Sequence, residues 1–265
     1  MTYTTKSTPL KGEKINAKNL ENAPALTMEN LPAEVTQGDW GAIENMETTD
    51  LLVPKIFHMQ SVSQLVKDDK AKAGDFCDSI TGEVLAKRDE KLEIIVFGSY
   101  KTMIISKKRL GESKYKLDKI ITIVPENARE WASKPLEETR EGDSYKYNLT
   151  YNLYCLIPGR MAGLPYVLSL GSTKTKAAKK INNIIYNLAE IRRPGASVVF
   201  ELKSVEDSND QGSWYGIEVS QGRNTEPAEL MRAHAWYTKS KSQKFVAVEE
   251  EAAEAAAGSS EDAPF

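Results

Sequence analysis

The alternation of apolar and polar residues along the chain predicts mainly β-strands. The clearest pattern covers residues 145–157, where Tyr and Leu residues occupy one face of a predicted strand and Lys, Asn and Thr residues occupy the other. Gly98 interrupts a second strand pattern and indicates either a bulge or a break into two strands. Further strands are predicted at 83–88, 92–106, 116–124, 164–170, 197–205 and 214–220.

One amphipathic helix is predicted at about 174–191, because its apolar residues recur at helical spacing until Pro194 and Gly195 end the pattern. A second helix is predicted at 228–239. The charged stretch 126–142 is typical of a short helix or an excursion outside the core.

Strands dominate and do not alternate regularly with helices, which argues against a parallel α/β sheet. The order fits a five-stranded oligonucleotide-binding (OB) barrel, a fold that commonly places its helix after the third strand and before the last two. We therefore expect a mainly β, OB-fold-like barrel with extra loops and disordered termini. Other small barrels and α+β sheets stay open as alternatives.

Composition divides the chain into three parts. Residues 1–45 form an expected flexible N-terminal arm, residues 46–245 the OB-like domain, and residues 246–265 a disordered acidic tail. The net charge is −3 and the segment from Glu249 onward contributes −6, so residues 1–248 carry +3. A basic body with an acidic appendage is often found in nucleic-acid-binding proteins, although a charge this small requires clustered lysines to be informative.

Catalytic and metal-binding patterns are hard to find. The two histidines, His58 and His234, fall in no HExxH pattern, and no CxxC, phosphate-binding loop or Gly-x-Ser-x-Gly motif occurs. Cys77 and Cys155 are expected to be buried thiols rather than a disulfide, and a metal site would require four remote residues to converge. No enzyme activity, metal or cofactor is predicted. The absence of an apolar run of eighteen residues or a signal core gives no membrane span and an expected cytoplasmic location.

Lysines and aromatic residues recur together, which is a pattern typical of proteins that bind single-stranded nucleic acid. Cations neutralise phosphates, and aromatic rings stack on unpaired bases for about 1–3 kcal/mol per base. The candidate residues in the strands and their connecting turns are Tyr100, Lys101, Lys107, Lys108, Arg109, Lys114, Tyr115, Lys116, Tyr145, Lys146, Tyr147 and Tyr151.

Each candidate also has a plain structural interpretation. The face formed by Tyr145, Tyr147 and Tyr151 could equally pack a barrel core, and the turn at 107–109 could be an ordinary solvated turn. In the first turns of the predicted helix, positive charge opposes the helix macrodipole, which hints at an anion nearby, although basic solvated helix faces are common. Those helix candidates are Lys174, Lys176, Lys179 and Lys180.

The C-terminal residues carry the most specific signal. The tip Asp262-Ala263-Pro264-Phe265, preceded by Glu261 and earlier glutamates, resembles the tail tip of bacterial and bacteriophage single-stranded-DNA-binding proteins. The stretch from 52–56 through 79–83 is similar to phage-encoded proteins of this class. The resemblance implies an OB domain that holds single-stranded DNA, in the cytoplasm of an infected host. It also implies a tip, Glu261 to Phe265, that recruits replication, recombination or repair proteins.

From this resemblance and the lysine–aromatic pattern we expect sequence-independent binding and protection of single-stranded DNA, by a single chain or by a homo-oligomer. One alternative is a phage recombination protein that anneals complementary strands. Another is a structural or adaptor phage protein that does not bind DNA, whose acidic tail only increases solubility.

Overall fold

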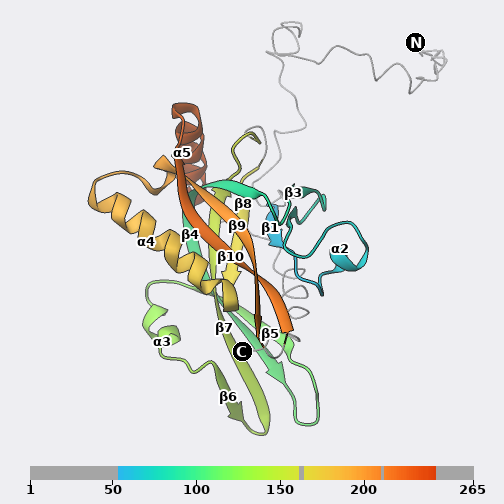
Figure 1. Ribbon diagram of the computed structural model, residues 1–265. Coiled ribbons are helices and arrows are strands. Elements are labelled where there is room, and N and C mark those ends of the chain that lie inside the picture. Colours follow the sequence, from blue (N-terminus) through green and yellow to red (C-terminus); the bar gives the residue numbers. More distant parts are fainter. Residues whose placement is uncertain (1–52, 161–163, 210–211, 243–265) are drawn as a thin grey trace, which may run out of the picture. The chain divides into compact units, whose positions relative to one another are not determined.

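A curled, mostly antiparallel sheet forms the framework of the protein (Figure 1). The computed structural model describes residues 53–160, 164–209 and 212–242. The expected mainly β class is confirmed. The strands are β1 (Lys55–His58), β2 (Phe76–Asp78), β3 (Val84–Ala86), β4 (Lys91–Lys108), β5 (Lys116–Ile123), β6 (Glu137–Arg140), β7 (Asp143–Leu156), β8 (Tyr166–Gly171), β9 (Val198–Asn209) and β10 (Gly212–Asn224).

The main path of the sheet runs β10-β9-β4-β7-β8-β1-β2-β3, with β5 added to β4 and β6 added to β7. The described residues thus form ten strands rather than five. The surplus arises because β4 and β7 are long enough to pair with different partners along their lengths, and because β2 and β3 are short additions. The register of β4 against β7 shifts between Val96 and Gly98, so Gly98 marks a bulge inside one strand.

The barrel region, residues 53–98 and 150–224, encloses the main apolar cluster. Helix α4 (Thr175–Glu190) buries Ala177, Ala178, Ile181 and Leu188 in this cluster, together with Leu153 and residues from several other strands. Helix α5 (Pro227–Ser242) buries Ala233 against Ile95, Phe97, Leu156 and Val199 in a second cluster. Cys77 and Cys155 are buried and free, as the sequence predicted.

The arm, residues 99–149, is a four-stranded antiparallel extension of the same sheet in the order β5-β4-β7-β6. It lies at the lower end of Figure 1, together with the short helix α3 (Ala128–Ala132). Its apolar cluster is small, with Met103, Ile105 and Tyr147 as the buried residues. Trp131 of α3 packs against this cluster, so the stretch 126–142 does contribute to apolar packing, contrary to the sequence interpretation.

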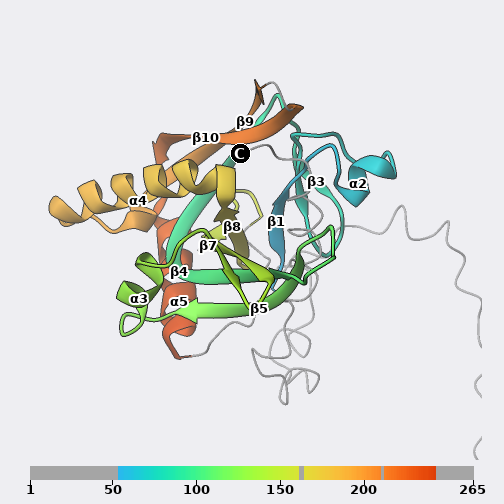
Figure 2. The ribbon, with the colours of Figure 1, turned by 90° about the horizontal axis from the view of Figure 1, so that it is seen from below.

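Side chains, rather than backbone pairing, join the two ends of the sheet path. Gln60 accepts a hydrogen bond from the Tyr215 N–H and donates one to the Tyr215 carbonyl, both at 3.0 Å. His58 Nε2 lies 2.9 Å from Ser204 Oγ, and the Arg88 guanidinium donates to the Tyr215 hydroxyl at 3.3 Å. We call these residues, with Gly74, the seam. Figure 2 shows the sheet curling so that β1 and β3 come round towards β9 and β10.

Gly74 fits this seam because it has no Cβ. Its φ is +92°, and a Cβ placed there would lie 2.7 Å from Tyr215 Cδ1 and 2.9 Å from Ser204 Oγ. No side chain can approach so closely without displacing its neighbours. The seam is therefore packed tightly as well as hydrogen-bonded.

The other short helices are α2 (Gln64–Lys67) between β1 and β2, and the 3₁₀ turns η4 (Ser172–Lys174) and η5 (Gly195–Ser197) on either side of α4. All of these lie where the sequence has loop character. They connect the strands and add little to the buried core.

Candidate nucleic-acid interface

The register of β4 and β7 brings predicted lysines over predicted tyrosine rings. Lys101 is paired with Tyr151 on β7, with its Nζ 5.2 Å from the ring centroid, and Lys107 is paired with Tyr145 at 5.3 Å. Lys108 Nζ lies 5.0 Å from the centroid of Tyr115, which is in the loop before β5. These distances suit cation–π contacts. The lysine–aromatic pattern of the sequence thus becomes a set of direct contacts in the arm.

The candidates divide between two faces of the β4–β7 pair, in the arm and at the adjoining Tyr151, because successive residues of a strand point to opposite sides. Alternation and register place Lys101 and Lys107 with Tyr145, Tyr147 and Tyr151 on one face. The same register places Tyr100, Lys108 and Lys146 on the other face. The predicted residues therefore do not form one continuous stripe.

The tyrosines of the first face differ in burial. Tyr147 and Tyr151 are buried, whereas Tyr145 is half-buried. Tyr147 donates a hydrogen bond to Glu138 Oε1, and burial together with this bond raises the pKa of Tyr147 to about 12. Core packing is thus the favoured role for Tyr147 and Tyr151, and Tyr145 is the one of the three whose ring is partly accessible.

Carboxylates neutralise some of the basic residues near the β4–β5 turn. Lys107 forms an ion pair with Asp143 at 2.8 Å, which raises the pKa of Lys107 and lowers that of Asp143. Lys116 pairs with Glu112 at 2.9 Å. By contrast, Lys101, Lys108 and Arg109 form no ion pair with the residues that the structure describes. The neutralisation of Lys107 by Asp143 was not predicted, because Asp143 lies 36 positions from Lys107 in the chain.

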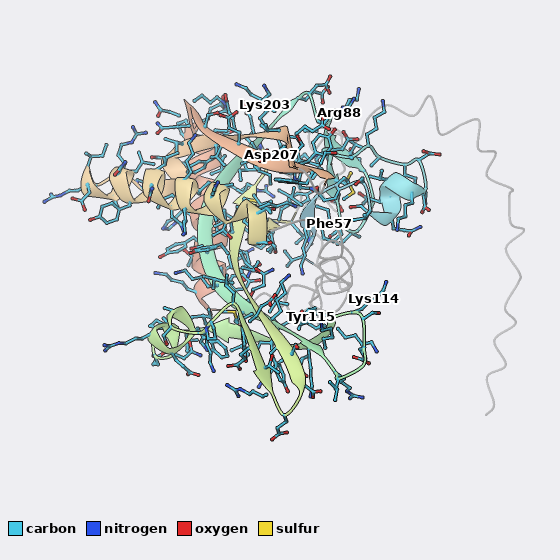
Figure 3. The ribbon with its side chains drawn as sticks, turned by 60° about the horizontal axis from the view of Figure 1, so that its bottom comes forward. Phe57, Arg88, Lys114, Tyr115, Lys203 and Asp207 are labelled. Carbon is cyan, nitrogen blue, oxygen red and sulfur yellow. The ribbon has the colours of Figure 1, made fainter. Side chains whose placement is uncertain are left out.

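Lys114 and Tyr115 occupy the β4–β5 loop, away from the barrel residues Arg88, Lys203 and Asp207 (Figure 3). Lys114 is exposed and Tyr115 is half-buried. The loop therefore presents a cation and a partly accessible ring together.

Tyr100 and Lys146, on the second face, are half-buried. Tyr100 packs against Tyr154 with ring centroids 5.2 Å apart. Burial lowers the pKa of Lys146. Both residues are integrated into the sheet surface more than their sequence pattern indicates.

The four helix candidates do not act as one group. Lys174 precedes α4 in η4, where its ammonium donates a 3.4 Å hydrogen bond to the carbonyl of His58, and burial lowers its pKa to about 8. Lys176, Lys179 and Lys180 are exposed on α4. Tyr186 is 66% exposed on the same helix and was not among the predicted residues.

Groups of His, Cys, Asp and Glu that could hold a metal ion are absent from the described residues. Within the same part of the chain, no helix is both long and apolar enough to cross a membrane. The predicted N-terminal arm and the tip Glu261 to Phe265 lie outside the described residues.

The sequence of this chain matches one protein-family model over most of its length. The family model described as Pam3 phage gp34-like protein matches residues 23–247. The chain belongs to the Pam3 phage gp34-like family. This assignment confirms the phage origin expected for this gp34-like chain. No curated protein and no solved structure matches it.

Proposed function

We propose that this gp34-like protein binds single-stranded DNA through the lysines and half-buried tyrosines of its arm, without sequence preference. The observation that carries the proposal is the set of lysine–tyrosine contacts made by Lys101, Lys107 and Lys108. Lys101 on the first face, and Lys108 and Arg109 at the β4–β5 turn, supply cations for phosphates. Tyr115 and Tyr145 supply partly accessible rings for bases. Tyr147 and Tyr151 hold these groups in place from the interior.

The acidic tip adds a second part to the proposal. Asp262 to Phe265 offers an apolar side chain beside carboxylates, which suits a basic-rimmed apolar pocket on a replication or recombination protein. In this scheme the arm holds the strand while the tip recruits the partner. Removing Phe265 should therefore leave DNA affinity unchanged.

The first test is binding of fluorescent oligo-dT by the full chain across a salt series. Affinity should fall steeply with salt, because cations that contact phosphates release counterions. Replacing Lys101, Lys108 and Arg109 together by Gln should reduce the slope of log K against log salt by about 2, at roughly 0.7 per phosphate contact. The control replaces the exposed Lys67, Lys70 and Lys72 by Gln, which removes the same charge from the α2 side of the barrel.

The second test concerns the rings. Tyr145→Ala and Tyr115→Ala should each weaken binding by about 1–3 kcal/mol if one base stacks on each ring, with little change in melting temperature. Tyr147→Ala should instead lose stability first, since that ring is buried in the arm cluster. The proposal fails if the wild-type chain does not bind oligo-dT at low salt or prefers duplex DNA.

One observation favours a structural or adaptor role as a second candidate. Leu110 and Leu136 of the arm are 83% and 76% exposed, and such apolar residues suit a protein contact. Under this alternative, Leu110→Ser would abolish assembly with a protein partner, and oligo-dT would not bind at any salt concentration.

A further inference from the structure

We infer that the exposed face of α4 is a second contact surface for the same DNA strand, continuing from the arm. This inference rests on the proposed function. The surface consists of Lys176, Lys179, Lys180, Asn183 and Tyr186, and we call it the α4 stripe. Its ligand is the phosphate backbone of single-stranded DNA, with one base stacked on Tyr186.

The helical spacing gathers these residues on one side of α4. Lys179 and Lys180 follow Lys176 by three and four positions, and Tyr186 lies seven positions after Lys179. Residues at these spacings share a helix face. The stripe is opposite the apolar side of the helix, which buries Ala177, Ala178, Ile181 and Leu188. It spans about 15 Å at 1.5 Å per residue.

The lysines of the stripe form no ion pair with any residue that the structure describes. The first turn of α4 contains no acidic residue. Lysines so close to a helix N-terminus repel each other and oppose the macrodipole. A polyanion would reverse both effects, since it supplies negative charge where the helix and its lysines favour it.

The exposed aromatic ring distinguishes this surface from an ordinary solvated helix. Tyr186 is 66% exposed, and no described residue stacks on its ring or holds a cation over it. Tyr237 of α5, in contrast, has Lys241 Nζ 4.4 Å from its ring centroid. An open ring beside a row of lysines matches the combination that binds unpaired bases.

Contacts at the start of α4 connect the helix that carries the stripe to β7. The N–H of Ser172, just before α4, donates a 3.2 Å hydrogen bond to Asn148 Oδ1 of the arm. Tyr151, whose ring lies under Lys101, belongs to the same apolar cluster as Ala177 and Ile181 of α4. The end of the arm that joins the barrel region therefore adjoins the start of the helix, and a DNA strand held by Lys101 can pass from there along α4.

The experiment compares three triple variants of the full chain in oligo-dT binding across a salt series. Replacing Lys176, Lys179 and Lys180 by Gln should lower the salt slope by about 2, whereas the control at Lys67, Lys70 and Lys72 should change it by much less. The third variant replaces Lys101, Lys108 and Arg109 of the arm by Gln, and its salt slope should fall by about 2 as well. With increasing oligonucleotide length, the gain in affinity should be smaller for the α4 variant than for the wild type.

Tyr186→Ala is an independent second test, with Tyr237→Ala as its matched control. We expect a loss of roughly fivefold or more in affinity for Tyr186→Ala only, corresponding to about 1 kcal/mol or more per stacked base. If the α4 variants match their controls while the arm variant binds weakly, this inference is wrong and the proposed function stands. If the wild type does not bind oligo-dT, the proposed function and this inference are both wrong. That outcome includes the case in which the stripe binds an acidic protein instead of DNA.

Discussion

The barrel region and the arm belong to one sheet but are stabilised in different ways. The barrel surrounds a large apolar cluster with residues such as Leu153, Phe200 and Ile181 fully buried, and side chains close it at the seam. The arm has a small cluster, and it relies on cross-strand lysine–tyrosine contacts and ion pairs such as Lys107–Asp143. The barrel is therefore built for stability, whereas the arm can present polar groups because few of its residues are needed for packing.

The largest effect should come from removing apolar groups from the barrel core. Leu153→Ala should cost about 3–5 kcal/mol, because Leu153 is fully buried and the surrounding strands cannot collapse into the cavity. Met103→Ala in the arm should cost about 2 kcal/mol, since partly exposed neighbours can move in. Urea unfolding measures both values. Equal losses would show that the arm is as tightly packed as the barrel.

The seam should be the next most sensitive place. Gly74→Ala places a methyl group against Tyr215 and Ser204, which should cost about 1–3 kcal/mol beyond the strain of a positive φ. Gly111→Ala in the arm is the matched control, because Gly111 has φ +86° and, apart from its chain neighbours, no described residue has an atom within 4 Å of the place its new methyl group would take. Thermal unfolding of both variants separates crowding from backbone strain. Equal melting temperatures would contradict a tightly packed seam.

A smaller effect should appear only at acid pH. Burial, and secondarily the charge of Lys174, hold the pKa of His58 well below its usual value of about 6.5. As the pH falls to about 6.5 and below, His58 of the unfolded chain therefore binds a proton that His58 of the folded chain does not. The resulting stabilisation is complete above pH 6.5 and is lost as the pH falls below it.

Urea midpoints between about pH 7.5 and pH 5 test this sign, since the range brackets the ordinary histidine pKa. The midpoint of His58→Gln should change less over this range than that of the wild type, whereas His234→Gln, at an exposed position, should follow the wild type. If His58→Gln keeps the full wild-type pH dependence, other groups are responsible for it.

Local patterns predicted most of the elements. The alternation in β7 and the apolar spacing in α4 are visible in the sequence, because each strand or helix buries one face. The recurrence of lysines and aromatic residues is also visible in the sequence, but the contact of Lys107 with Tyr145 was not predicted, because it depends on the register of β4 against β7.

What the sequence could not predict depends on contacts between remote segments. His58 and Ser204 lie 146 positions apart, and their hydrogen bond exists only because the sheet curls. For the same reason, the inward orientation of Lys174 was not predictable from its place in a row of lysines. Trp131 packs against the buried Tyr147, although it lies in a stretch whose charged residues suggested solvent exposure.

Gln60 has a consequence for self-association. Its side-chain amide occupies both the N–H and the carbonyl of Tyr215, and so takes the place of a peptide group from a neighbouring strand. Strand β10 pairs with β9 on one side, so Tyr215 lies on the edge where another chain could add a strand. Because Gln60 fills that position, edge-to-edge growth into aggregates is interrupted there. A residue that closes the fold thus also covers the backbone groups of Tyr215 that an added strand would need.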